Sequence, residues 1–272
     1  MLKKSGAILA IMFLVLLVAV PAYAINYGEP DGNGHPFVGL MVAKDAEGQP
    51  LWRCSGTLIA PTVFLTAGHC TESPAVSAEI WFAPEIERGD PVYNYPYGTK
   101  KTSVSGKTYT HPQYIPGAFF LYDLGVVVLK KGVKVGTYGQ LPEPAVLDGL
   151  ANKRGQQDTT ITAVGYGLQR VRSNPAGPDF TLDDLRREIA VLDLVSVNGT
   201  AGVPSGVSIL VSGNANTGGT CFGDSGGPLF LNDTNIVAAV TSFGINGNCA
   251  GVGGGYRVDM PDDLEWVKSF LK

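Results

Sequence analysis

Short apolar runs, separated by clusters of turn-forming residues, recur along most of this chain. Runs of four to eight residues rich in Val, Ile, Thr and aromatic residues are typical of β-strands. In the first half of the chain they cover Val38–Ala43, Gly56–Ile59, Val63–Thr66, Ile80–Ala83 and Leu124–Leu129. The last run contains four consecutive apolar residues, which suits a strand buried on both faces.

The same pattern resumes after Leu141-Pro142-Glu143-Pro144, which we interpret as a linker between two halves. The strands predicted beyond it are Thr160–Tyr166, Glu188–Val197, Val207–Val211, Pro228–Leu231, Ile236–Phe243 and Tyr256–Val258. The stretch from Gly167 to Asp179 is rich in Gly, Pro and Arg, and we expect an exposed loop there.

The C-terminal segment, residues 261–271, departs from this pattern. It starts with Pro261 followed by two acidic residues, as helices often do. Its apolar residues Leu264, Val267, Phe270 and Leu271 fall on one face at helical spacing. We therefore predict a helix docked on a β-rich body.

Composition supports an all-β fold with many turns. Glycine and proline together supply 54 of 272 residues, about one in five, where average usage gives about one in eight. The 44% of hydrophobic residues excludes a disordered chain. Only 16% of residues are charged and the formal net charge is −4, which argues against a nucleic-acid partner.

The first 24 residues have the pattern of a signal peptide. Lys3 and Lys4 precede an apolar run of 14 residues, and Ala22-Tyr23-Ala24 supplies a small-x-small cleavage site. The alternative is a membrane anchor, but the run is shorter than the roughly 20 residues needed to span a bilayer. We expect cleavage after Ala24, which would leave a soluble, secreted protein of 248 residues with no membrane attachment.

The four cysteines are interpreted as disulfides, because export makes an oxidising compartment available. Three connectivities exist, and we favour the sequential one, Cys54–Cys70 and Cys221–Cys249. A metal site is the alternative, but the chain has no Cys-x-x-Cys pair and only three histidines.

His69 is the best candidate for a general base. It directly follows a predicted strand, in Leu65-Thr66-Ala67-Gly68-His69-Cys70, where a disulfide at Cys70 would fix its backbone. His35 and His111 each precede a proline among loop-forming residues, so we expect surface positions for both.

A serine nucleophile is indicated by Gly223-Asp224-Ser225-Gly226-Gly227-Pro228. Glycines on both sides let a tight turn present the Ser225 hydroxyl and let the N–H groups of Gly223 and Ser225 converge as an oxyanion hole. The alternatives are an ordinary glycine-rich turn and the nucleophile elbow of α/β-hydrolases. The elbow needs a helix after the serine, whereas a proline and an apolar strand follow here.

Asp123 lies at the start of the apolar run Leu124–Leu129, where a carboxylate needs a hydrogen-bond partner. An imidazole N–H is a suitable partner, and a strand-capping turn residue is the alternative.

Together these motifs resemble the trypsin/chymotrypsin (S1) family of serine endopeptidases, over essentially the whole chain from Ile25 onward. The order His69, Asp123, Ser225, with spacings of 54 and 102 positions, distinguishes this family from subtilisins and α/β-hydrolases. The resemblance implies two antiparallel six-stranded β-barrels with a C-terminal α-helix, and the same two disulfides. We expect the first barrel over residues 25–140, the second over 141–258 and the helix over 259–272.

By this resemblance, Ser225 is the nucleophile, His69 the general base and acid, and Asp123 the residue that orients the imidazole. Gly223 and Ser225 supply the oxyanion hole. The amine of Ile25, freed by signal cleavage, would pair with Asp224. Protein or peptide substrates and protein inhibitors are the expected partners of a monomer, and neither a cofactor nor a metal is implied.

The resemblance also locates the primary specificity pocket. Its base falls at Gly219, where an acidic residue would select basic side chains. We therefore expect an uncharged pocket that prefers apolar or aromatic side chains. The other positions expected to shape it are Thr220, Ser242, Phe243, Gly244 and Gly254.

Overall fold

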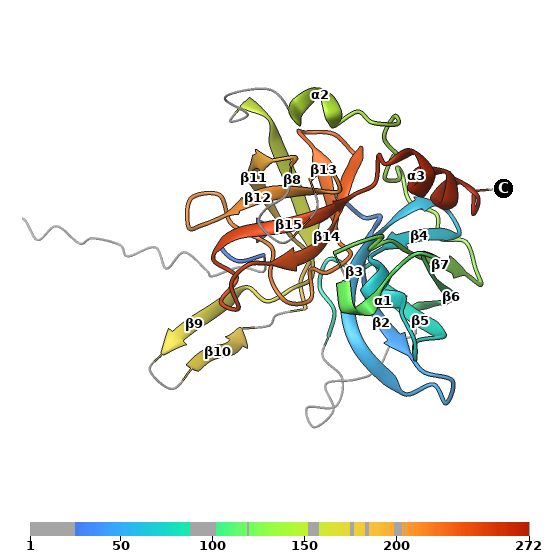
Figure 1. The fold of residues 1–272 in the computed structure, drawn as a ribbon. Coiled ribbons are helices and arrows are strands. Elements are labelled where there is room, and N and C mark those ends of the chain that lie inside the picture. Colours follow the sequence, from blue (N-terminus) through green and yellow to red (C-terminus); the bar gives the residue numbers. More distant parts are fainter. Residues whose placement is uncertain are drawn as a thin grey trace, which may run out of the picture.

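The computed structural model of the chain describes residues 25–87, 102–118, 120–151, 158–174, 177–182, 185–198, 203 and 205–271 (Figure 1). The predicted signal peptide lies outside these residues. Within the described ranges, no helix is both long and apolar enough to cross a membrane.

The first half folds into a closed antiparallel barrel with the strand order β2-β3-β4-β7-β6-β5. These strands are β2 (Val38–Lys44), β3 (Pro50–Ala60), β4 (Val63–Thr66), β5 (Ser77–Trp81), β6 (Val104–Thr110) and β7 (Gly125–Leu129). Five of the six correspond to runs that the sequence pattern predicts. β6 does not, because Val-Ser-Gly-Lys-Thr-Tyr-Thr contains few apolar residues.

The second half forms another antiparallel ring, β8-β11-β12-β15-β14-β13, which closes through pairing of β13 and β11 with β8. The strands are β8 (Thr160–Gly165), β11 (Glu188–Ser196), β12 (Ser208–Gly213), β13 (Pro228–Leu231), β14 (Val237–Gly244) and β15 (Gly251–Arg257). A short strand, β1 (Glu29–Pro30), pairs with β11 outside the ring. The predicted fold class, two six-stranded barrels with a C-terminal helix, is confirmed.

The segment expected as an exposed loop after Gly167 is instead largely a two-stranded antiparallel sheet, so that expectation is wrong. Its strands are β9 (Arg170–Asn174) and β10 (Gly177–Leu182). The sequence of β9 has a single apolar residue, Val171, so the alternation that marks a half-buried strand is missing.

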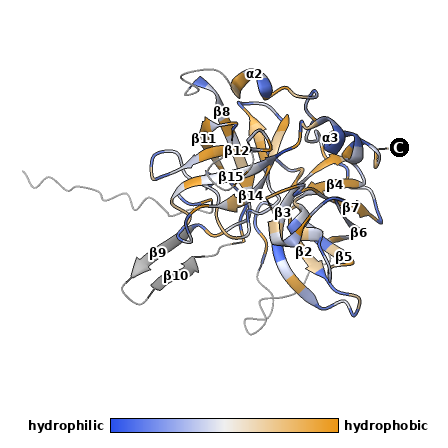
Figure 2. Ribbon diagram, viewed as in Figure 1, coloured by the Kyte–Doolittle hydropathy of each residue, from blue (hydrophilic) through white to orange (hydrophobic). Residues whose placement is uncertain are grey.

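Apolar side chains fill both barrels, and Figure 2 shows hydrophobic colouring along their strands. One buried cluster fills the first barrel and continues through Val164, Phe230 and Tyr256 of the second. A second cluster, which includes Leu192, Ile209 and Ala238, fills the second barrel. The continuity of the first cluster holds the two barrels against each other.

Short helices complete the fold. They are α1 (Gly68–Thr71), the 3₁₀ turn η1 (Pro116–Ala118), α2 (Asp148–Ala151) and α3 (Pro261–Lys268). α3 begins at Pro261 as predicted, has acidic residues in its first turn, and buries Leu264 and Val267.

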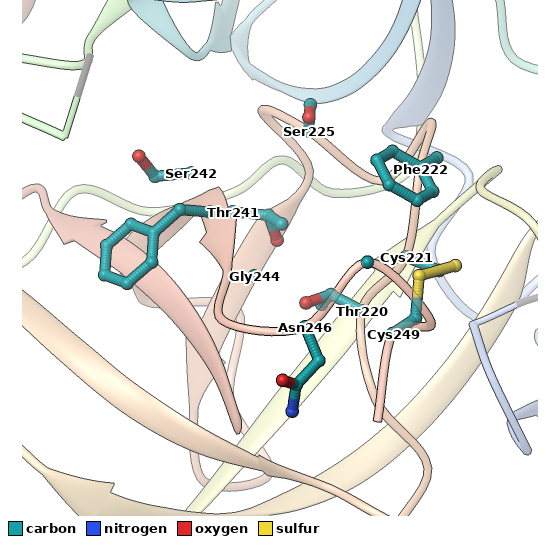
Figure 3. Close-up of a pocket in the computed structure, with 11 residues that line it drawn as sticks. Thr220, Cys221, Phe222, Ser225, Thr241, Ser242, Gly244, Asn246 and Cys249 are labelled. Carbon is teal, nitrogen blue, oxygen red and sulfur yellow. A yellow bond between two sulfur atoms is a disulfide. The ribbon is translucent and has the colours of Figure 1, made fainter. Parts of the chain in front are cut away.

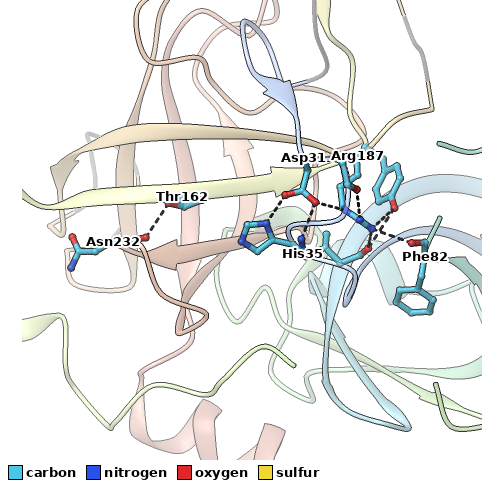
Figure 4. A network of polar contacts seen from close by, with 9 residues as sticks. Asp31, His35, Phe82, Thr162, Arg187 and Asn232 are labelled. Carbon is cyan, nitrogen blue, oxygen red and sulfur yellow. Dashed lines mark hydrogen bonds and ion pairs between the residues drawn. The ribbon is translucent and has the colours of Figure 1, made fainter. Parts of the chain in front are cut away.

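A buried arginine connects the two barrels near the N-terminal segment (Figure 4). Arg187 is fully buried, and its Nε donates to Asp31 Oδ2 at 2.7 Å. Its remaining nitrogens donate to the carbonyl oxygens of Gly32, Val38 and Phe82 at 2.8–3.2 Å, and to the Tyr166 hydroxyl at 3.1 Å. Val38 and Phe82 belong to the first barrel and Tyr166 to the second, so one guanidinium contacts both.

Candidate active site

The structure brings His69 and Asp123 together at the start of α1 and β7. Asp123 is fully buried, and His69 Nδ1 lies 2.9 Å from its Oδ2 and 3.1 Å from its Oδ1. The backbone N–H of His69 also donates to Asp123 Oδ1, at 2.8 Å. The Cys54–Cys70 disulfide joins α1 to β3 beside the imidazole.

A serine from the second barrel also binds this carboxylate. Ser242 Oγ, on β14, donates to Asp123 Oδ2 at 2.5 Å. The sequence places Ser242 among the pocket residues and gives no sign of this bond, because the two residues are 119 positions apart. Asp123 therefore accepts hydrogen bonds from both barrels.

Burial and two neighbouring carboxylates, Asp123 and Glu72, shift the pKa of the His69 imidazole. Burial lowers the pKa of His69, but the charge of Asp123, its hydrogen bond and the charge of Glu72 raise it, and the pKa lies above its ordinary value. Glu72 follows α1 directly. Burial, Asp123 and Glu72 also raise the pKa of Tyr114, so this phenol stays protonated.

The Ser225 turn lies against α1 and β3. Ser55 N–H donates to the Ser225 carbonyl oxygen at 2.8 Å, and Cys70 Sγ is 3.6 Å from the same oxygen. Gly226 has φ of +76°, and a Cβ there would collide with Thr66 Oγ1, so only glycine fits. Ser225, half-buried, is thus held next to the residue that follows His69.

Two anchored carbonyls set the direction of the expected oxyanion-hole donors. The Phe222 carbonyl accepts from Leu168 N–H and the Asp224 carbonyl from Gly227 N–H, both at 2.8 Å. In a trans peptide the following N–H points away from the carbonyl, so the N–H groups of Gly223 and Ser225 point away from these partners. Neither donates a hydrogen bond within the described part of the chain.

Asp224 and Ile25, the residues expected to pair, are both buried in the second barrel. Asp224 is 1% exposed, and its carboxylate accepts from Gly167 N–H at 2.8 Å and from Cys221 N–H at 2.9 Å. Ile25 belongs to the second apolar cluster, and Asn26 forms a β-bridge with Gly219. The segment that begins at Ile25 thus lies inside the fold.

A cavity of about 270 Å³ opens beside Ser225 (Figure 3). Ser225 lies at one end and Asn246 at the other, with the Cys221–Cys249 disulfide along one side and Ser242 along the opposite side. The described residues that line it include none with a charge; they are Thr220, Cys221, Phe222, Ser225, Thr241, Ser242, Phe243, Gly244, Asn246, Gly247 and Cys249.

Four of the six residues expected at the pocket line this cavity, whereas Gly219 and Gly254 are not among its lining residues. The Phe243 ring packs directly on Gly254, where a Cβ would collide with it. The absence of a side chain at Gly254 therefore leaves room for this ring. The sequence argument did not place four of the lining residues at the pocket: Phe222, Asn246, Cys221 and Cys249. The position of Phe222 next to Gly223 could have indicated that it lies near the site.

The surface position expected for His111 is wrong, and His35 is only partly exposed. His111 is 5% exposed and its ring stacks on Tyr122 at 5.4 Å. His35 is half-buried, stacks on Phe230 at 5.4 Å, and has Nδ1 2.5 Å from Asp31 Oδ1. The prolines that follow them mark turns in the backbone, and turns can still be covered by packing.

One group of side chains has the composition of a metal site: Cys54, His69 and Cys70 offer ligand atoms within 4.8 Å of one another. Both sulfurs are joined in a disulfide, so neither can act as a thiolate ligand. This group does not fit a metal ion.

Comparison with known proteins defines the class. The family model described as Trypsin matches residues 28–262. A protein named Trypsin from Saccharopolyspora erythraea is 31% identical over 232 residues, covering 80% of this chain and 86% of that protein. Brachyurin from Leptuca pugilator is 28% identical over 226 residues, covering 81% of this chain and 85% of that protein.

A solved structure named HL collagenase has the same fold, with a TM-score of 0.67 and 21% identity. The match covers 90% of this chain and 97% of that one. The chain therefore belongs to the trypsin family of serine endopeptidases, and it has the chymotrypsin fold with two disulfides.

Proposed function

We propose that the protein hydrolyses peptide bonds through Ser225, His69 and Asp123, by way of an acyl-enzyme. The observation that carries this proposal is the buried Asp123 carboxylate bound to His69 Nδ1, next to the Ser225 turn. Because Asp123 accepts a hydrogen bond from Nδ1–H and so keeps the proton on Nδ1, the neutral imidazole has a lone pair on Nε2 that can accept the serine proton.

The reaction then follows from these positions. Ser225 Oγ attacks the substrate carbonyl carbon while its proton moves to His69 Nε2. The carbonyl oxygen becomes an oxyanion, which accepts hydrogen bonds from the N–H groups of Gly223 and Ser225. His69 protonates the leaving amine, the C–N bond breaks, and the acyl group stays on Ser225. A water molecule, deprotonated by His69, then releases the acid and restores the serine.

We further propose that cleavage after Ala24 exports the protein and frees the Ile25 amine to pair with Asp224. The burial of Ile25 and of Asp224, the central residue of the Gly223–Ser225 turn, supports this role. Export and activation would then be a single event. N-terminal sequencing of the secreted protein tests this proposal, and a start upstream or downstream of Ile25 would refute it.

The uncharged lining of the cavity supports a preference for apolar or aromatic side chains before the cleaved bond. A carboxylate would be needed to hold Lys or Arg there, because burying an unpaired cation is costly. Cleavage of a peptide library only after Lys or Arg would contradict this specificity.

The remaining assignments are proposals of the same kind. We assign the first barrel to residues 25–140, the second to 141–258 and the helix to 259–272. We expect a secreted monomer that acts on proteins or peptides and that protein inhibitors can block. Sedimentation of the secreted protein would test the monomer.

The decisive experiment is labelling with a fluorophosphonate, which reacts with activated serines. Labelling of the mature protein that is abolished in Ser225→Ala and strongly slowed in Asp123→Asn is expected. A folded protein that fails to label, or that labels equally in Ser225→Ala, would favour a non-catalytic binding protein. Digestion of a folded protein substrate separates an endopeptidase from an esterase of small substrates.

A further inference from the structure

One buried carboxylate of the C-terminal helix contacts side chains that lie near the candidate site. Asp263, in the first turn of α3, is 2% exposed. Its Oδ2 accepts a hydrogen bond of 2.6 Å from the Tyr256 hydroxyl, and its Oδ1 lies 3.3 Å from His111 Nε2. Only the Tyr256 contact is a hydrogen bond: within the described residues Asp263 Oδ1 has no hydrogen-bond partner, and His111 lies beside it at ion-pair distance. Asp263 thus fixes the Tyr256 hydroxyl and attracts the His111 ring.

Tyr256 connects Asp263 to the residue before Asp123. It lies on β15 of the second barrel and is 2% exposed. Burial raises the pKa of Tyr256, as does the charge of Asp263, whereas a hydrogen bond to the Tyr122 backbone lowers it; the phenol stays protonated. Its hydroxyl thus donates to Asp263 and is close enough to the Tyr122 backbone to feel it.

His111 reaches the same residue from the other side. Its Nδ1 accepts from Gln113 N–H at 3.3 Å, so the neutral ring carries its proton on Nε2, the nitrogen that lies 3.3 Å from Asp263 Oδ1. Burial lowers the pKa of His111, against the charge of Asp263, and favours this neutral form. The ring stacks on Tyr122 at 6° between planes, and the His111 backbone N–H donates to the Leu124 carbonyl at 2.9 Å.

Both partners of Asp263 therefore meet at Tyr122, whose backbone is strained. Tyr122 has φ of +54°, a conformation that a bulky residue adopts only when its surroundings impose it. Leu124 N–H donates to the Tyr122 carbonyl at 2.7 Å, which closes a tight turn with Asp123 at its centre. The direction of the Asp123 side chain depends on this turn.

We propose that Asp263 is a positioning residue that holds the Tyr122–Asp123 turn, through Tyr256 and His111, and so orients the carboxylate that binds His69. This inference rests on the proposed role of Asp123. It gives the C-terminal helix a part in catalysis although no residue of α3 lines the cavity beside Ser225.

The test compares four variants of the mature protein. Asp263→Leu removes both contacts, Asp263→Asn keeps an oxygen for Tyr256, and Tyr256→Phe removes the hydroxyl alone. Leu264→Ala is the matched control, since it loosens the adjacent buried position of the same helix without removing a polar contact. Each variant is assayed well below its thermal midpoint.

We expect kcat and the fluorophosphonate labelling rate to fall together while KM stays unchanged. The fall should be about tenfold in Asp263→Leu and smaller in Asp263→Asn and Tyr256→Phe. The pKa seen in the acid limb of the rate profile should also fall, because Asp123 would hold protonated His69 less well. Partial rescue by Asp263→Asn is part of the expectation. Leu264→Ala should keep the wild-type kcat.

Wild-type kcat and acid limb in folded Asp263→Leu would overturn the proposal, and so would an equal loss of kcat in Leu264→Ala. If Asp263→Leu does not fold, an unchanged kcat in Tyr256→Phe overturns it. Failure of the proposed function itself would show differently, as undiminished labelling in Ser225→Ala or Asp123→Asn. That result would overturn this inference as well.

Discussion

Replacing Arg187 by Met should destabilise the protein strongly, although the residue lies outside the candidate active site. Methionine keeps much of the apolar stem but removes every donor. The Asp31 side chain is 1% exposed, and among the described residues its carboxylate would then keep only its contacts with His35. Removing one partner of a buried ion pair costs about 3–5 kcal/mol, because the other charge stays buried.

Two further effects act on this cost in opposite directions: lost hydrogen bonds add to it, and entering water offsets part of it. Three backbone carbonyls lose a donor, and each costs about 1–3 kcal/mol if it stays unsatisfied. Water that enters the space would recover part of this. Because whole domains are stable by only about 5–15 kcal/mol, the change should shift unfolding visibly.

The assay is urea unfolding followed by tryptophan fluorescence, in a Ser225→Ala background that prevents self-digestion. Lys44→Met is the control: its ion pair with Glu79, at 2.7 Å, is partly exposed and should contribute less than about 1 kcal/mol. The double variant Asp31→Asn/Arg187→Met should recover part of the loss. A loss in Arg187→Met no larger than in the control would refute the reasoning.

The pH dependence gives this prediction a sign. Burial raises the pKa of Asp31, but the hydrogen bonds from His35 and Arg187 and the charge of His35 lower it, and the lowering is larger. A lowered folded pKa stabilises the protein above the unfolded value of about 3.9, and this contribution is lost as pH falls through the folded pKa. Arg187→Met should weaken that dependence.

Three further predictions concern the site. Because the pKa of His69 is raised, kcat/KM should rise with pH through a midpoint above the ordinary histidine value. Glu72→Gln should move that midpoint down, and an unchanged midpoint would contradict the contribution of Glu72. Gly244→Val should fold, because a Cβ there meets only Asn246 O at 3.8 Å, but should lower kcat/KM for aromatic substrates by about tenfold relative to small ones; an equal loss for both would refute the pocket assignment. Removing the Cys221–Cys249 disulfide, which closes a loop of 28 positions, should cost about 3–4 kcal/mol in thermal unfolding and disturb the cavity wall, and an unchanged unfolding midpoint would contradict this.

Sequence reasoning could propose those candidate site residues whose signal lies in their neighbours along the chain. His69 follows a strand of its own barrel, Asp123 precedes one, and Ser225 stands among glycines, so neighbouring residues supply the signal for each. The apolar run at Val126 to Leu129 likewise predicted β7. Periodicity indicated two β-rich halves, while the closure of each half into a barrel came from the family resemblance.

Contacts between distant residues carried no such signal. The bond from Ser242 to Asp123 spans 119 positions, and that from Tyr166 N–H to Ser55 Oγ spans 111. His111 was expected at the surface because the residues beside it form turns. It is buried because Tyr122 and Trp266, the latter 155 positions away, cover its ring.

The environment of Asp123 shows why the site requires both barrels. A buried carboxylate without partners costs several kcal/mol, which hydrogen bonds must offset. His69 donates from the first barrel, through its backbone and its ring, and Ser242 donates from the second. Neither barrel alone supplies this full set of donors. Association of the barrels and burial of the charged Asp123 are therefore coupled, and whatever holds the barrels together, the Arg187 contacts included, also stabilises the site.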